Sequence, residues 1–199
     1  DESEEEASAA AAKKAAAKPE EPELFPDVKV EQTRQGIEAA KNQANALFQR
    51  GSLEESVRWF SKALWLVESG KVSDVPVELR SILHSNRACA YVRLKRWGDA
   101  EQDWTDALAL NGGNTKAKYR RALARFELGR AEGALEDVEQ VLREIPDPSK
   151  NRDAADLKQR ILDARKVAEE PAQSPDAEKT PNGGWRRMEI VEASDDESE

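Results

Sequence analysis

The sequence predicts an all-α fold built from a short array of helical hairpins, and two observations support it. Between residues 37 and 168, apolar residues recur at the three- and four-residue spacing of an amphipathic helix, and the segments end at glycine or proline. The segments also recur in pairs with a period of 34 residues. Within this block no segment alternates apolar and polar residues as a half-buried strand would.

Seven apolar stripes mark the predicted helices in order. Gly51 ends the first stripe and Gly129 the fifth, because glycine readily adopts the left-handed conformation that closes a helix. Pro146 ends the sixth stripe, because proline lacks the amide hydrogen that a helix interior needs. The stripes are Ile37–Phe48, Leu53–Leu66, Ile82–Leu94, Ala100–Leu108, Tyr119–Phe126, Ala134–Leu142 and, within a helix over about 151–168, Leu157–Ala164.

The repeat is visible when Ala88 is aligned with Ala122, which also aligns Trp104 with Val138. The first pair of helices matches the second at a larger offset of 44 residues, because Ser69–Glu78 is inserted between them. Small residues recur where two helices must approach closely, and bulky residues recur where the next hairpin stacks. One hairpin cannot bury its apolar face alone, so the sequence predicts a stacked array.

This pattern resembles the tetratricopeptide (TPR) repeat. The resemblance implies a TPR superhelix over residues 24–168, with repeats at about 37–70, 81–114 and 115–148 and a solvating helix at 151–168. Two positions depart from the family pattern: Ser56 replaces the usual alanine and Lys95 replaces the usual glycine.

Composition narrows the function classes. The chain has 199 residues, 31 Lys and Arg, 40 Asp and Glu, one cysteine and one histidine. The block 37–168 carries 23 basic and 20 acidic residues, so it is mildly basic between acidic flanks, and nucleic-acid binding is not expected. A lone cysteine excludes an internal disulfide and favours a reducing, cytoplasmic setting. One Cys and one His cannot fill a zinc site, so we expect no metal and no cofactor.

The flanks lack the apolar residues needed to form a core. Residues 1–23 are predicted to be a disordered acidic and Ala/Lys tether, and residues 169–184 a polar linker. Residues 185–199 form a short peptide motif and an acidic tail. No apolar run reaches the roughly 18 residues that a membrane span needs.

Five polar residues recur at positions that face the concave side of such an array. Lys41 and Asn45 are four residues apart, as are Lys116 and Arg120, so each pair shares a helical face. Asn86 lies on the helix between them, where asparagine is a poor helix former. Three cations and two amides in one concavity predict a site for a carboxylate-rich ligand.

Residues 41–45, 85–88 and 116–122 resemble the three segments of the dicarboxylate clamp in co-chaperone TPR domains, above all those of the sperm-associated antigen type and their mitochondrial-import relative. The resemblance implies that the five residues bind the C-terminal Glu-Glu-Val-Asp tail of cytosolic seventy- or ninety-kilodalton heat-shock chaperones. It also implies that Phe48 and Cys89 form the apolar pocket for the valine of that tail.

Several residues have more than one interpretation. Lys118, Arg121 and Arg125 either add to the positive field of the groove or face water. His84 is interpreted as a partly buried structural residue rather than a catalyst. The tryptophans at 59, 65, 97 and 104 fall mostly at packing or turn positions, so core packing is preferred over nucleobase stacking.

The C-terminal motif has four interpretations. Trp185–Glu192 has enough bulk to add as a strand to the sheet edge of a partner. Ser194, followed by acidic residues, is a candidate phosphosite for an acidophilic kinase and resembles the phosphopeptide read by a PIH-type adaptor, although Ala193 stands where that motif prefers Asp. The tail could instead only aid solubility, or fold back into the clamp of its own chain.

The sequence thus predicts a non-enzymatic, cytoplasmic co-chaperone that links a heat-shock chaperone to another assembly. It contains no phosphate loop, metal set or nucleophile–base pair, so no catalytic residue is assigned. The alternative is a structural TPR scaffold in a large multi-subunit complex, with no free-carboxylate ligand.

Overall fold

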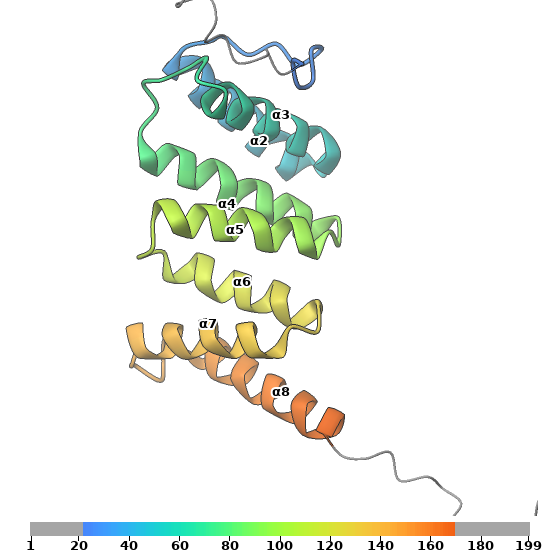
Figure 1. The fold of residues 1–199 in the computed structure, drawn as a ribbon, viewed down its shortest axis with the longest axis vertical. Helices are drawn as coiled ribbons and strands as arrows, with labels where there is room; N and C mark the ends of the chain where they lie inside the picture. Colours follow the sequence, from blue (N-terminus) through green and yellow to red (C-terminus); the bar gives the residue numbers. More distant parts are fainter. Residues whose placement is uncertain (1–21, 170–199) are drawn as a thin grey trace, which may run out of the picture.

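The computed structural model describes residues 22–169, which form helices stacked in chain order (Figure 1). Each helix packs against the next one along the chain, and α2 also contacts α4. The all-α prediction is confirmed: three antiparallel hairpins are followed by one closing helix, as in a TPR array. The helices are α2 (Arg34–Arg50), α3 (Leu53–Glu68), α4 (Val77–Arg93), α5 (Trp97–Leu110), α6 (Thr115–Glu127), α7 (Ala131–Glu144) and α8 (Arg152–Glu169).

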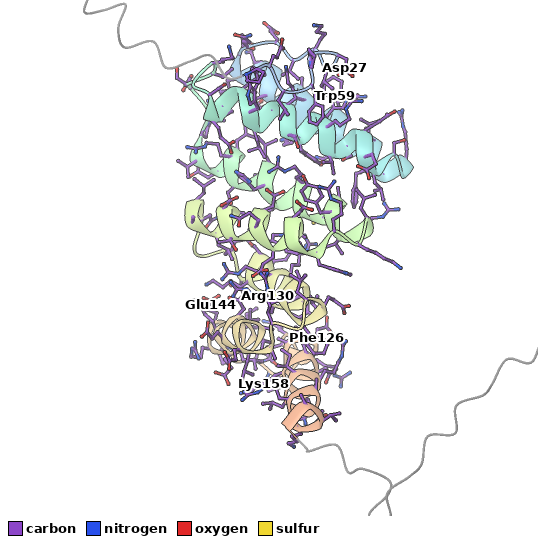
Figure 2. The ribbon with its side chains drawn as sticks, turned by 45° about the vertical axis from the view of Figure 1, so that its right-hand side comes forward. Asp27, Trp59, Phe126, Arg130, Glu144 and Lys158 are labelled. Carbon is purple, nitrogen blue, oxygen red and sulfur yellow. The ribbon has the colours of Figure 1, made fainter. Side chains whose placement is uncertain are left out.

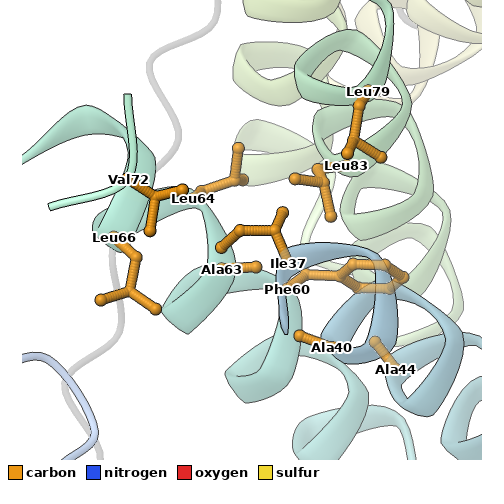
Figure 3. Packing of buried hydrophobic residues seen from close by; sticks show 10 residues of the cluster. All are labelled: Ile37, Ala40, Ala44, Phe60, Ala63, Leu64, Leu66, Val72, Leu79 and Leu83. Carbon is orange, nitrogen blue, oxygen red and sulfur yellow. The ribbon is translucent and has the colours of Figure 1, made fainter. Parts of the chain in front are cut away.

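Small residues let the two helices of the first hairpin pack closely. Ala40 and Ala44 of α2 are buried together with Phe60 of α3, whose ring lies over the two alanines in Figure 3. Ser56, at a position where alanine is usual, is fully buried, and its Oγ donates a hydrogen bond to the carbonyl oxygen of Ala44 at 2.8 Å. This bond satisfies a hydroxyl that would otherwise be costly to bury.

The same packing recurs in the later hairpins. Ala88 packs with Trp104 in the second cluster, and Ala122 packs with Val138 in the third. Helix α8 covers the third hairpin with Ile161 and its neighbours, so the last apolar face of the stack is not left in water. Two members of the predicted stripes differ from the others, because Ile82 on α4 is 45% exposed and Ala164 on α8 is exposed as well.

The hairpin turns share one backbone conformation. Gly51 and Gly129 follow α2 and α6 with φ of 86° and 72°, in the left-handed region that glycine accepts without steric cost. Lys95 occupies the equivalent position of the second hairpin and has φ of 59°. A lysine therefore holds a conformation that costs a residue with a Cβ about 1–2 kcal/mol.

Residues 22–32 cross the outer side of α3, at the end of the stack opposite α8 (Figure 1). Lys62 of α3 is 2% exposed, and its Nζ lies 2.5 Å from Oε1 of Glu23 and 2.9 Å from the carbonyl oxygen of Leu24. Arg58 contacts Asp27, and Figure 2 shows Asp27 and Trp59 at the same end of the molecule. The segment thus covers the face of the first hairpin that has no preceding repeat.

Several predicted features lie outside the described residues: most of the 1–23 tether, the linker from residue 170 onward, Trp185–Glu192 and Ser194. Of the helices within residues 22–169, none combines the length and the apolar composition that crossing a membrane requires.

Replacing Lys95 with glycine should relieve the strained turn between α4 and α5. We expect Lys95→Gly to raise the free energy of unfolding by about 1 kcal/mol, because glycine pays no Cβ penalty at positive φ. Urea denaturation followed by circular dichroism measures the change. Lys95→Ala is the matched control, since it removes the charge and keeps the Cβ; an equal gain in both variants would show that charge, not backbone strain, is responsible.

Candidate functional site

The structure brings the two predicted amides together between α2 and α4. Asn86 Nδ2 donates a hydrogen bond to Asn45 Oδ1 at 3.1 Å, and both side chains are half-buried. Each amide retains a hydrogen-bonding group for a ligand, because the Asn45 nitrogen and the Asn86 oxygen are not used in this bond. Lys41 is half-buried one helical turn before Asn45, on the same face of α2.

A second contact joins α4 to α6. Arg120 Nη1 donates to Cys89 Sγ at 2.9 Å, and Cys89 follows Asn86 by three residues on the same face of α4. Burial raises the pKa of the Cys89 thiol, and the positive charges of Arg120 and Lys116 oppose that rise. Lys116 and Arg120 are therefore both close enough to Cys89 to act on it electrostatically.

The three predicted cations have no carboxylate partner in the part of the chain that the structure describes. Within residues 22–169, Lys41 and Lys116 form no ion pair, and the side-chain contact of Arg120 is with the Cys89 thiol. A thiol with a raised pKa is neutral near pH 7, so it leaves the charge of Arg120 uncompensated. Cations without a carboxylate partner, together with amides that have unused hydrogen-bonding groups, favour an anionic ligand.

The neighbouring cations on α6 have a different role. Lys118, Arg121 and Arg125 neither extend the groove nor face water, because each bonds a carboxylate between the helices. Lys118 is 5% exposed, and its pairing with Glu144 lowers the pKa of that carboxyl. Figure 2 shows Glu144 near the C-terminal end of the stack. The pairs are Lys118–Glu144, Arg121–Asp137 at 2.7 Å, Arg125–Glu101 at 2.9 Å and Arg125–Asp137 at 3.0 Å.

A cavity of about 320 Å³ opens beside the Cys89–Arg120 contact, between α4, α5 and α6. Its walls are largely apolar, with Arg120 and Glu127 as the charged members. The lining residues are Cys89, Val92, Trp97, Trp104, Arg120, Leu123 and Glu127.

Of the two residues predicted to form an apolar pocket, Cys89 lines this cavity and Phe48 does not. Phe48 packs against the second core cluster, together with Cys89, but Arg93 covers its ring. The Arg93 guanidinium lies 5.0 Å from the ring centroid and donates a hydrogen bond to the Phe48 carbonyl oxygen at 3.0 Å. The residue pattern of α2 does not predict this contact, because the guanidinium belongs to α4.

Sequence reasoning missed most of the cavity lining. Leu123 and Glu127 follow Arg120 by three and seven residues, and Val92 follows Cys89 by three, so all share a helical face with a predicted site residue. That spacing was the available signal. Trp97 and Trp104 line the cavity only because of how α5 packs, and their spacing along the sequence does not predict this position.

His84 is buried at 6% exposure, with its Nδ1 3.0 Å from Asp103 Oδ1. Among the described residues, His84, Asp103 and Asp106 are grouped closely enough for their donor atoms to share a metal ion. Arg87 already donates to both oxygens of Asp103, at 2.6 and 2.7 Å. A metal ion would have to displace this guanidinium, so the group is better explained as a structural network.

No protein-family model matches the chain. Over 101 residues the chain is 36% identical to the mitochondrial import receptor subunit TOM70 of Rattus norvegicus, a match that covers 51% of this chain and 16% of TOM70. The chain therefore corresponds to a small part of that protein.

Two solved TPR domains resemble this chain, and each match covers nearly the whole of the solved domain. The first TPR of Spaghetti (RPAP3), bound to the HSP90 peptide SRMEEVD, is 32% identical with a TM-score of 0.57; the match covers 67% of this chain and 95% of that one. The second TPR domain of human RPAP3, in complex with the HSP70 peptide SGPTIEEVD, is 28% identical with a TM-score of 0.53 and corresponding shares of 63% and 94%.

Adjacent arginines on α6 should respond differently to the same substitution. Arg121→Met breaks the pair with Asp137, whose side chain is 5% exposed, so we expect a loss of about 2–4 kcal/mol in the free energy of unfolding. Arg120→Met breaks no ion pair among the described residues and should change stability by less than about 0.5 kcal/mol. Urea denaturation of both variants tests the assignment, and equal losses would contradict it.

The single cysteine reports on the electrostatics of the groove. The pH–rate profile of Cys89 alkylation by iodoacetamide should have its midpoint above that of an ordinary cysteine, because burial raises the pKa of the thiol. Arg120→Gln should move the midpoint higher still, because a charge that favours the thiolate is lost. An unchanged midpoint in Arg120→Gln would mean that the guanidinium does not act on this thiol in solution.

Proposed function

Because the chain belongs to the tetratricopeptide repeat family and is homologous to co-chaperone domains that bind heat-shock proteins, we propose that its groove binds the free C-terminal tail of a cytosolic chaperone. The ligand is an extended acidic peptide that ends in Glu-Glu-Val-Asp. Lys41, Asn45, Asn86, Lys116 and Arg120 bind its terminal carboxylate and the last aspartate side chain.

The single observation that carries the proposal is the uncompensated charge of Lys41, Lys116 and Arg120. Other cations on α6 are neutralised by carboxylates of neighbouring helices, whereas these three have no such partner in the described part of the chain. A ligand with two carboxylates compensates this charge by charge-assisted hydrogen bonds. The free donor of Asn45 and the free acceptor of Asn86 complete the set.

The cavity beside Arg120 supports the same ligand class. Cys89, Val92 and Leu123 give it apolar walls, so it suits the side chain of an apolar residue upstream of the acidic end. Both peptides in the RPAP3 complexes have such a residue before Glu-Glu, methionine in one and isoleucine in the other. Methionine suits irregular cavities because its unbranched side chain adapts its shape.

The expected affinity is modest. Each charge-assisted hydrogen bond contributes about 1.5–3 kcal/mol, and ordering a flexible tail costs about 2–5 kcal/mol. The balance corresponds to micromolar binding, about −8 kcal/mol. Because the contacts are ionic and partly exposed, binding weakens as salt is added.

The wider function follows from this groove. The protein acts as a non-enzymatic cytoplasmic adaptor, with the chaperone held by the helical domain and a second assembly bound through the flanks. Phosphorylated Ser194 is the site we assign to a PIH-type adaptor. A TPR scaffold with no free-carboxylate ligand is the competing function.

Amidation of the ligand tests the proposal directly. We expect SRMEEVD with a free carboxylate to bind residues 1–199 in the micromolar range, and the same peptide with a C-terminal amide to bind at least about tenfold more weakly, because it lacks the terminal charge. Fluorescence anisotropy with labelled peptide measures both constants. Equal affinities for the two forms, or no binding of either, would favour the scaffold.

Lys116→Ala and Arg120→Ala should each reduce binding of the free-acid peptide by at least about tenfold, because each removes one charge-assisted contact. Circular dichroism should be unchanged, since neither residue forms an ion pair within the described chain. Arg143→Ala is the control: it removes an exposed cation of α7 that forms no ion pair in the described residues and should leave affinity unchanged.

A further inference from the structure

Glu127 is the carboxylate of the cavity and has no role in the interactions described so far. It is the last residue of α6, it is exposed, and it forms no ion pair within residues 22–169. The nearest basic residues in the sequence are already engaged, because Arg125 and Arg130 both bond Glu101. The carbonyl end of a helix is itself negative, so a carboxylate there adds to a field that attracts cations.

The position of Glu127 along α6 relates it to one residue of the ligand. Glu127 follows Lys116 by eleven residues, which is about 16 Å along a helix at 1.5 Å per residue. An extended peptide advances about 3.3 Å per residue, so the same distance spans about five peptide residues. A peptide whose terminal carboxylate lies at Lys116, and which runs toward the cavity, thus brings the fifth residue before its end to Glu127.

We infer that Glu127 is a specificity-determining residue that selects ligands with a basic side chain five residues before the terminal aspartate. This inference rests on the proposed function, since it assumes that the carboxylate end of the ligand lies at Lys116 and Arg120. The aliphatic part of the arginine or lysine lies against the apolar rim of the cavity, and its charged end meets the Glu127 carboxylate.

The peptides of the two RPAP3 complexes differ at this position. In SRMEEVD the fifth residue before the final aspartate is arginine, and in SGPTIEEVD it is threonine. Glu127 therefore favours the first sequence over the second. It also repels an acidic residue at the same position. The site therefore selects peptides that have a basic residue upstream of their acidic C-terminal end.

The test is a double-mutant cycle with synthetic peptides. The wild-type chain should bind SRMEEVD about threefold more tightly than SQMEEVD, as expected for a pair at an exposed rim, and SEMEEVD more weakly still. Glu127→Gln should bind the first two equally. Glu127→Lys should reverse the order and prefer SEMEEVD. Added salt should reduce the wild-type preference.

Glu136→Gln is the matched control, because Glu136 is an exposed carboxylate on α7 that forms no ion pair among the described residues and does not line the cavity. It should keep the wild-type order of affinities. If the wild type binds SRMEEVD and SQMEEVD equally, or if Glu127→Gln keeps the preference, the inference is wrong while the carboxylate site stands. If none of the peptides binds, both proposals fail.

Discussion

The organisation of this protein depends on where the carboxylates of each repeat lie. Arg87 on α4 bonds Asp103 on α5, and 34 residues later Arg121 on α6 bonds Asp137 on α7. Each arginine also donates to a hydroxyl of the preceding hairpin, Ser61 for Arg87 and Thr105 for Arg121. These arginines therefore connect the two helices of one hairpin and join that hairpin to the one before it.

This network determines which cations remain for a ligand. The acids of the second helices neutralise the arginines that point between helices, and among residues 22–169 no acid pairs with Lys41, Lys116 or Arg120 on the first helices. Arg120 and Arg121 are neighbours in the sequence, yet one bonds a neutral thiol and the other a buried aspartate. The charge that pairs inside the fold and the charge that we propose for ligand binding are thereby separated by about 100° of helical rotation.

The two ends of the array are closed by contacts other than the arginine–aspartate network. The first hairpin has glutamine and tryptophan at positions 43 and 59, where the later hairpins have the arginine and aspartate of the network. Residues 22–32 compensate by covering α3 and pairing with Arg58 and Lys62. At the other end α8 covers the apolar face, and Lys158 pairs with Glu139 of α7 at 2.9 Å (Figure 2). Each end is closed because a repeat without a neighbour exposes the face that stacking would bury.

The helices, their pairing and the candidate site residues could all be predicted from the amino-acid sequence. Apolar periodicity and the 34-residue repeat depend on the geometry of single helices and hairpins, which local sequence encodes. The packing of the helices was needed to establish that Arg120 has no carboxylate partner among residues 22–169, that Arg93 covers Phe48, and that Trp97 and Trp104 complete one cavity. Each of these outcomes depends on groups supplied by different helices, and the spacing within one helix contains no information about the charge or volume of its neighbours.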